Sequence, residues 1–210
     1  MKFLTKLFAP DIFECIEQGK VSRIKKLISG DRSLLNKQNA QGNTPLMHAV
    51  DCMQLQATKF LLESGAKINI QDNEGNTALA ICTMWDSSEC AKELIKHRAD
   101  VTSKDKKGVS ILMKAAYYGS PELMELLLAH GANIHHIDDE GNSVLIWAIQ
   151  GESILSINVE FLLEQGADKY YKNPQGKTAL DFLYDIKDEF EEVEEDIEEF
   201  KIVKKMLSTD

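Results

Sequence analysis

Hydrophobic residues recur along the chain in short groups that fit one face of a helix. The clearest group has Leu46, Ala49 and Val50 at positions i, i+3 and i+4. The same spacing returns at Leu79, Cys82 and Thr83, at Leu112, Ala115 and Ala116, and at Leu145, Ala148 and Ile149. A second apolar run follows, most clearly in ELMELLLAHGA at 122–132. The pattern predicts pairs of short helices that repeat along the chain, with small residues where helices approach.

A glycine precedes each helix pair at a nearly constant spacing. Gly42, Gly75, Gly108, Gly141 and Gly176 are separated by 33, 33, 33 and 35 residues. Three residues before each glycine is an Asn or Asp that can bond back onto a turn, namely Asn39, Asp72, Asp105, Asp138 and Asn173. Two residues after each glycine is a hydroxyl residue suited to cap a helix, namely Thr44, Thr77, Ser110, Ser143 and Thr178. Such a fixed period predicts a stacked array of repeats.

This combination resembles the ankyrin repeat, whose family pattern runs D-x-x-G-x-T-P-L-H-x-A-A, then a second helix, then L-L-x-x-G-A-D-V-N. Pro45 stands at a first helical position, and Gly65, Gly131 and Gly166 follow second helices, as the family pattern requires. The resemblance implies an all-α fold. Its architecture would be an ankyrin-repeat solenoid of stacked helix-turn-helix units with β-turn-like connecting tips.

Two features depart from the family pattern. The histidine that follows the leucine is absent from every copy, and Met47, Ala80, Met113, Ile146 and Asp181 stand in its place. We therefore expect the hydrogen bonds that this histidine makes between turns to be missing. Arg98 replaces glycine after the second helix of the second repeat, where left-handed backbone would strain a larger residue.

The resemblance covers Asn39 to Lys172 as four repeats and extends into partial repeats on both sides. We expect an N-terminal segment and capping repeat at 1–38, repeats at 39–71, 72–104, 105–137 and 138–172, and a C-terminal capping repeat with an acidic helix at 173–210. The residues from Asp11 to Lys37 predict two short helices broken at Gly19. The fourth repeat has two extra residues, which we place between Trp147 and Phe161 as a tolerated loop insertion.

The first ten residues, MKFLTKLFAP, are basic and amphipathic. They lack the apolar core of a signal peptide, and no later segment is apolar enough to span a bilayer. We expect their apolar residues, Phe3, Leu4, Leu7 and Phe8, to pack on the first repeat, with membrane-surface binding as the alternative.

The negative charge of the chain is concentrated near its end. Between Asp185 and Glu199 there are ten Asp or Glu and one Lys, whereas the whole chain has a net charge of −10. An apolar stripe runs through the same segment, formed by Ile186, Phe190, Val193, Ile197, Phe200, Val203 and Leu207. We expect a long closing helix whose stripe covers the last repeat. Its acidic face is either a solvated cap or a platform for a basic partner.

No motif of catalysis or cofactor binding is present in the sequence. The four cysteines, Cys15, Cys52, Cys82 and Cys90, show no disulfide or metal-ligand spacing, and we interpret Cys15 and Cys82 as buried thiols. His135 and His136 are adjacent near Asp138 and Asp139, but adjacent residues without a third ligand rarely bind one metal ion. A pI near 5.0 disfavours nucleic-acid binding. We therefore expect a non-enzymatic monomer without cofactor or metal, in the cytoplasm, with the nucleus or secretion as an effector as alternatives.

In an ankyrin-like stack, the residues six, nine and ten after each turn glycine face a concave groove. These are His48, Asp51 and Cys52; Ile81, Met84 and Trp85; Lys114, Tyr117 and Tyr118; and Trp147, Gln150 and Gly151. Trp, Tyr and Met are enriched at the centres of protein interfaces. We predict one contiguous patch of Met84, Trp85, Tyr117, Tyr118 and Trp147, with Lys114 adding polar or cation–π selection and Trp147 lying partly in the core. Polar turn-tip residues would form its rim: Asn73, Glu74, Lys106, Lys107, Asp139 and Glu140.

The resemblance and the aromatic residues together predict a module that binds another protein through its groove. One alternative is an inhibitor whose acidic helix blocks a basic, nucleic-acid-binding surface of a partner. The other is an enzyme whose site matches no known motif, which is disfavoured because the repeats account for nearly the whole chain.

Overall fold

The computed structural model describes residues 11–151, 156–186 and 194–208, with side chains described from 198 in the last range. These residues form α-helices joined by turns and one short 3-10 helix. Within these ranges, strand-like pairing is limited to an isolated bridge between Lys104 and Ser110. The predicted all-α fold is confirmed. The chain divides into two compact units, Met1–Asp100 and Val101–Asp210.

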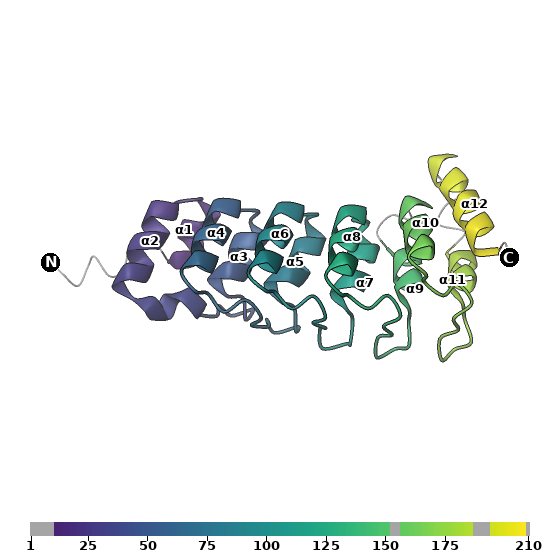
Figure 1. The fold of residues 1–210 in the computed structure, drawn as a ribbon, viewed down its shortest axis with the longest axis horizontal. Helices are drawn as coiled ribbons and strands as arrows, with labels where there is room; N and C mark the ends of the chain where they lie inside the picture. The colour runs from purple at the N-terminus through teal and green to yellow at the C-terminus, as the bar shows by residue number, and fades with distance from the viewer. Residues whose placement is uncertain (1–10, 152–155, 187–193, 209–210) are drawn as a thin grey trace. The chain divides into compact units, whose positions relative to one another are not determined.

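The first unit contains three helix pairs (Figure 1). Its elements are α1 (Ile12–Glu17), α2 (Val21–Gly30), the 3-10 helix η2 (Arg32–Asn36), α3 (Pro45–Asp51), α4 (Leu55–Glu63), α5 (Ala78–Met84) and α6 (Ser88–Lys96). The first helices of successive pairs contact one another, α1 with α3 and α3 with α5. The second helices do the same, α2 with α4 and α4 with α6. The unit therefore has a layer of first helices and a layer of second helices.

The second unit also contains three helix pairs (Figure 1). They are α7 (Ile111–Tyr118) with α8 (Pro121–Ala129), α9 (Val144–Ile149) with α10 (Ser156–Glu164), and α11 (Ala179–Asp185) with α12 (Glu194–Ser208). The first helices α7, α9 and α11 contact in sequence, and α10 lies between α8 and α12. Among the described residues, no helix has the length and apolar content needed to cross a bilayer.

Each turn before a first helix is held by the side chain that the sequence predicts. Asp72 Oδ1 accepts hydrogen bonds from the backbone N–H groups of Glu74 and Asn76, both at 2.8 Å. The same two bonds form in the other turns, to Asn39, Asp105, Asp138 and Asn173. The turn glycines have φ between 73° and 93°, a conformation that strains any residue with a Cβ atom.

The hydroxyl caps are confirmed at four of the five predicted positions. Thr44, Thr77, Ser110 and Thr178 each accept a bond from the third backbone N–H of the following helix. Ser143 occupies the same position before α9 but makes no side-chain capping bond. Such a cap contributes about 1 kcal/mol to helix stability.

Other side chains form hydrogen bonds at two of the positions where the family's histidine is absent. Asp181 Oδ2 accepts from the backbone N–H of Thr178 at 2.8 Å and from its hydroxyl at 2.7 Å. Met47 Sδ accepts from the backbone N–H of Thr44 at 3.3 Å. At the start of α3 and of α11, the N-cap N–H is therefore bonded to a side chain three residues later in the same repeat. Hydrogen bonds from Thr178 lower the pKa of Asp181 below its ordinary value.

The core of each unit lies between its two helix layers. The equivalent leucines of the first helices, Leu46, Leu79, Leu112 and Leu145, are each 1% exposed. Cys15 and Cys82 are fully buried thiols, as predicted, and Cys90 is buried as well. Complete burial of each leucine stabilises the fold by about 1.5 to 3 kcal/mol.

Left-handed residues end the second helices as the pattern predicts. Gly65, Gly131 and Gly166 have φ between 85° and 97°, and Arg98 adopts φ 69° at the equivalent position. Two further non-glycine residues, Met53 and Asp86, are left-handed between the helices of the first two full repeats, where Gly119 stands in the third. Each of these side chains carries a conformational cost of about 1 kcal/mol.

The predicted helix break at Gly19 and the longer connector of the fourth repeat are both found. Gly19, with φ 61°, separates α1 from α2. The connector from α9 to α10 covers residues 150–155, compared with 119–120 between α7 and α8. At its start, Gly151 approaches the Tyr117 carbonyl so closely that a Cβ atom would clash with it. Residues 152–155, and the whole segment 1–10 expected to pack on the first repeat, lie outside the described residues.

The closing segment agrees in part with the predicted stripe. Phe200, Val203 and Leu207 of α12 are buried, and α12 contacts α10 and α11. Ile186 is instead the C-cap of α11, and therefore does not lie within α12. Phe190, Val193, Ile197 and most of the acidic run lie outside the described residues and side chains. Of the described acidic side chains, Glu198 is exposed, whereas Glu199 Oε2 accepts from the Ser156 N–H at 2.6 Å, at the start of α10.

Two turn glycines of the second unit allow the contact between neighbouring turns to be tested. A Cβ atom at Gly141 would clash with the ring of Pro174, whereas no atom lies within 4 Å of one at Gly176. Both glycines have similar positive φ, 83° and 77°. We predict that Gly176→Ala lowers the free energy of unfolding by about 1 to 2 kcal/mol through backbone strain alone. Gly141→Ala should cost at least about 1 kcal/mol more, because overpacking adds to the strain. Urea denaturation measures both, and equal losses would contradict the role of the turn contact.

Candidate functional site

Trp85 is the most exposed aromatic residue among those predicted to line the groove. It follows the last residue of α5 as its C-cap, and 50% of its surface is exposed. Its Nε1 donates a hydrogen bond to Asp51 Oδ1, at the end of α3, at 2.9 Å. Met84, the preceding residue, is half-buried. The indole is thus fixed in orientation by the neighbouring repeat, while half of the residue's surface stays exposed to a partner.

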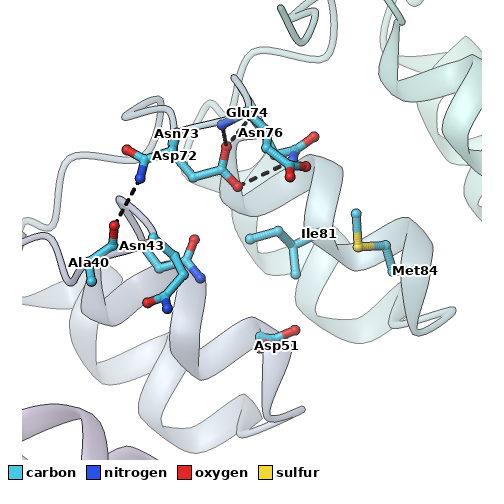
Figure 2. Close-up of a pocket in the computed structure, with 10 residues that line it drawn as sticks. Ala40, Asn43, Asp51, Asp72, Asn73, Glu74, Asn76, Ile81 and Met84 are labelled. Atoms are coloured by element: carbon cyan, nitrogen blue, oxygen red, sulfur yellow. Dashed lines mark hydrogen bonds between the residues drawn. The ribbon is translucent and has the colours of Figure 1, made fainter.

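A hollow of about 410 Å³ lies beside Met84 in the first unit. Figure 2 shows the turns that lie above the first helices and the side chains of α5 that line it. Its lining residues are Ala40, Gln41, Asn43, Asp51, Asp72, Asn73, Glu74, Asn76, Ile81 and Met84. The Asn73 side-chain N–H donates to the Ala40 carbonyl at 2.9 Å, which joins the two neighbouring turns (Figure 2). The hollow therefore has a rigid wall of turns and a floor of apolar side chains.

Three predicted aromatic residues contact one another in the second unit. The ring of Tyr117 meets Tyr118 at a centroid distance of 5.1 Å and Trp147 at 5.7 Å, both edge to face. All three side chains are half-buried. Trp147 Nε1 also donates to Asp138 Oδ2 at 2.8 Å. Trp147 is therefore partly packed, and its contribution to the groove stays a prediction.

Lys114 is engaged by an ion pair within its own repeat. Its Nζ lies 2.6 Å from Asp105 Oδ2, and the two side chains are only 14% and 10% exposed. Burial acts to raise the pKa of Asp105, but hydrogen bonds from Lys114 and from the backbone N–H groups of Lys107 and Val109 outweigh it and lower the pKa below its ordinary value. The ammonium group thus fixes the turn, and only a small part of it is exposed for the polar selection that the sequence suggested.

The predicted site residues are thus found in two groups. Met84 and Trp85 belong to the first unit, and Lys114, Tyr117, Tyr118 and Trp147 belong to the second. The structure brings together the three aromatic residues of the second unit. One contiguous patch across both groups stays a prediction. The rim residues Asn73, Glu74, Lys106, Lys107, Asp139 and Glu140 are all exposed, as expected.

Sequence reasoning missed the acidic residues that orient these side chains. Asp105 bonds Lys114 and Asp138 bonds Trp147, in each case across nine residues. Asp105 and Asp138 had been assigned only to their turns. Because both lie three residues before a glycine and both partners lie six after it, the constant spacing could have revealed the pairing. Asp51 was placed in the groove, but its bond to Trp85 spans two repeats and has no such local pattern.

A cysteine, a histidine and a glutamate lie together on the first helices without forming a catalytic triad. His48 Nε2 is 3.1 Å from Glu17 Oε1 and 3.9 Å from Cys52 Sγ. A triad needs the carboxylate on one ring nitrogen and the nucleophile on the other, whereas both partners here meet the same nitrogen. Burial also raises the pKa of the Cys52 thiol, which disfavours the reactive thiolate.

The remaining histidines take part in local structure. His136 Nε2 lies 2.7 Å from the carbonyl oxygen of Gly108, and His130 Nδ1 lies 2.8 Å from that of Leu126. His130 thus meets a late carbonyl of α8. Within the described ranges, no three His, Cys, Asp or Glu side chains are grouped to hold a metal ion.

Comparison with known proteins identifies the same repeats. The family described as "Ankyrin repeats (3 copies)" matches residues 12–105 and 112–183. A chain from the complex of the Bd0816 predatory endopeptidase of Bdellovibrio bacteriovorus with the immunity protein Bd3460 is 29% identical, with a TM-score of 0.77, covering 94% of this chain and 98% of that one. The ankyrin repeat domain of Bcl-3, of the IkappaB family, is 26% identical, with a TM-score of 0.73 and coverages of 82% and 78%. An ankyrin repeat domain of Acinetobacter baumannii, ABAYE2397, is 24% identical, with a TM-score of 0.76 and coverages of 93% and 95%, which shows the fold alone.

The ion pair in the second unit predicts a specific dependence of stability on pH. Since the folded-state pKa of Asp105 is lowered, its ionised form stabilises the fold above the ordinary carboxyl pKa, about 3.9. That contribution disappears as the pH falls through the lowered value. We predict that Asp105→Asn, which keeps the turn acceptor used by Asn39, costs about 1 to 3 kcal/mol at pH 7. The cost should shrink below about pH 3.9.

Urea unfolding of the wild type and Asp105→Asn between pH 7 and pH 2.5 measures this effect. A Lys114→Met background serves as control, because the same change at Asp105 should then cost less and depend less on pH. An equal cost of Asp105→Asn in both backgrounds would mean that the ammonium group contributes nothing.

Proposed function

We propose that this chain, which belongs to the ankyrin repeat family, is a non-enzymatic module that binds a partner protein through the groove side of its first helices. Ankyrin repeats are in general protein-binding modules, and the family matches most of the chain. The partner would be a helix, loop or peptide that meets Met84 and Trp85 in the first unit and Tyr117, Tyr118 and Trp147 in the second.

The observation that carries this proposal is the half-exposed indole of Trp85. A tryptophan with 50% exposure and a hydrogen bond to Asp51 pairs a large apolar surface with a fixed orientation. Most of the entropy cost of ordering this side chain has already been met by folding, so less is lost on binding. Residues of this type most often supply the dominant binding energy of an interface.

The aromatic group of the second unit supports the same proposal. Edge-to-face contacts hold the rings of Tyr117, Tyr118 and Trp147 together, and the bond to Asp138 fixes the indole. Trp147 thereby repeats the arrangement of Trp85, in which a neighbouring aspartate accepts from the indole N–H. In this proposal Lys114 acts at the edge of the contact, because its ammonium group is already bonded to Asp105.

One similar structure suggests a first class of partner to try. The complex of an endopeptidase with an immunity protein contains a chain that is 29% identical over nearly its whole length. A peptidase from the same organism as this chain is therefore a suitable first candidate. Its inhibition by the purified chain would assign a protective role.

We predict that replacing three of the aromatic anchors removes partner binding without unfolding the chain. Trp85→Ala and Tyr117→Ala should each weaken binding by about 1 to 4 kcal/mol, because each removes a preorganised contact surface. The measurement is capture from cell lysate with three baits: the native chain, the Trp85→Ala/Tyr117→Ala/Tyr118→Ala variant, and a chain whose acidic residues from Asp188 to Glu199 are neutralised.

Tyr170→Ala is the matched control for this experiment. Tyr170 is 60% exposed, and it belongs to the connector after α10 and to none of the first helices. Capture should be lost with the triple variant and kept with Tyr170→Ala. Loss only with the neutralised chain would support instead an acidic inhibitor of a basic partner, whose affinity would fall steeply with salt. A large drop in the melting temperature of the triple variant would assign these residues to the core.

A further inference from the structure

The hollow of the first unit lacks a hydrogen-bond donor that is present at the equivalent position of the third and fourth repeats. In the third repeat, Lys114 Nζ donates to Asp105 Oδ2 at 2.6 Å, and in the fourth, Trp147 Nε1 donates to Asp138 Oδ2 at 2.8 Å. Asp72 is the equivalent residue of the second repeat, and Ile81 stands where the donor should be. Ile81 has no polar hydrogen. Among the described residues, the second oxygen of Asp72 accepts only from the Asn76 side-chain N–H, at 3.2 Å, a long bond.

The other acceptors around the hollow are also incompletely used. Asn76 is 4% exposed, and its Oδ1 accepts no hydrogen bond from the described residues. Asn43 Oδ1, also in the lining of the hollow, likewise accepts no hydrogen bond from the described residues. An unpaired buried acceptor usually costs about 1 to 3 kcal/mol. These two amides line the space beside Asp72 (Figure 2), so the hollow is bordered by hydrogen-bond acceptors.

The charge on this side of the first unit is entirely negative. The first helices α1, α3 and α5 carry Glu14, Glu17 and Asp51, and no lysine or arginine. The hollow itself is lined by Asp51, Asp72 and Glu74, and by no cation. Within the described part of the chain, these three carboxylates form no salt bridge. By contrast, α2 carries Arg23, Lys25 and Lys26, so the positive charge lies in the layer of second helices.

We propose that this hollow binds an arginine side chain of a partner protein. The guanidinium group would supply to Asp72 the donor that Lys114 and Trp147 supply in the other repeats. Its planar fork carries five N–H donors and suits several acceptors at once, unlike the single ammonium group of lysine. The aliphatic stem would pack on Ile81 and Met84, and the half-exposed indole of Trp85 would cover an apolar residue next to the arginine. The inference rests on the proposed groove function and specifies the chemistry of its partner.

The two tryptophans of the chain provide a direct test by NMR. One indole N–H belongs to Trp85, beside the hollow, and the other to Trp147, in the second unit, so a ¹H–¹⁵N spectrum of the whole chain contains a probe and an internal reference. Trp85→Phe assigns the two signals. The ligand probe is N-acetyl-arginine amide, and N-acetyl-citrulline amide is its neutral analogue of the same shape.

The arginine probe should shift the Trp85 signal in a saturable manner and leave the Trp147 signal in place. The citrulline probe should give no saturable shift. Asp72→Asn should raise the Kd for the arginine probe at least tenfold, while the turn is retained because Asn39 and Asn173 hold equivalent turns with an amide. Ile81→Lys should abolish the saturable shift by placing an internal ammonium group against Asp72, as Lys114 does against Asp105.

Equal shifts with citrulline, equal shifts of both indole signals, or an unchanged Kd in Asp72→Asn would each overturn the arginine site. Thermal unfolding of both variants identifies any loss that comes from misfolding, and Asp72→Asn keeps the test decisive if Ile81→Lys does not fold. The same Asp72→Asn chain is also used as bait in the lysate capture. If it still captures the partner while the aromatic variant does not, the groove function stands and the arginine site is wrong.

Discussion

The structure depends on one local interaction. In each turn, a single Asn or Asp side-chain oxygen accepts hydrogen bonds from two backbone N–H groups. This bond pair closes the turn, in which glycine takes positive φ, and precedes the first helix. Neighbouring turns then contact through backbone and side chains, as Asn73 does with Ala40. Because each repeat touches mainly its neighbours, the accuracy of this turn determines how the helices of adjacent repeats pack.

The chemistry of the candidate site depends on the second oxygen of the turn aspartate, which makes no hydrogen bond to the turn backbone. A carboxylate has a second oxygen, and the repeats employ it differently: with the Lys114 ammonium group, with the Trp147 indole, or with no strong donor at Asp72. The same geometry therefore stabilises the fold in the second unit and leaves a polar opening in the first. If the proposed arginine site is correct, stability and recognition are two uses of one repeated position, and the residue nine places later decides between them.

The distribution of charge between the two helix layers of the first unit is consistent with a site for a cation beside Asp72. The first helices of the first unit carry only carboxylates as formal charges, while lysine and arginine lie on the second helices and connectors. Held next to Trp85 and Met84, the carboxylates create a surface that is both acidic and apolar. Such a surface is more selective than a purely apolar one, since a partner without a matching cation would leave these groups desolvated and unpaired.

The sequence by itself determined the repeats, their turns, most of the helix caps and the buried face of each first helix. These features depend on contacts within a few residues, so period and residue type suffice to predict them, as for Asp72 with its turn or Leu79 in its helix. Tertiary structure alone decided that Asp51 orients Trp85 and that Glu199 meets the start of α10. Those outcomes depend on the distances between helices that are far apart in the chain, and side-chain spacing in the sequence carries no record of them.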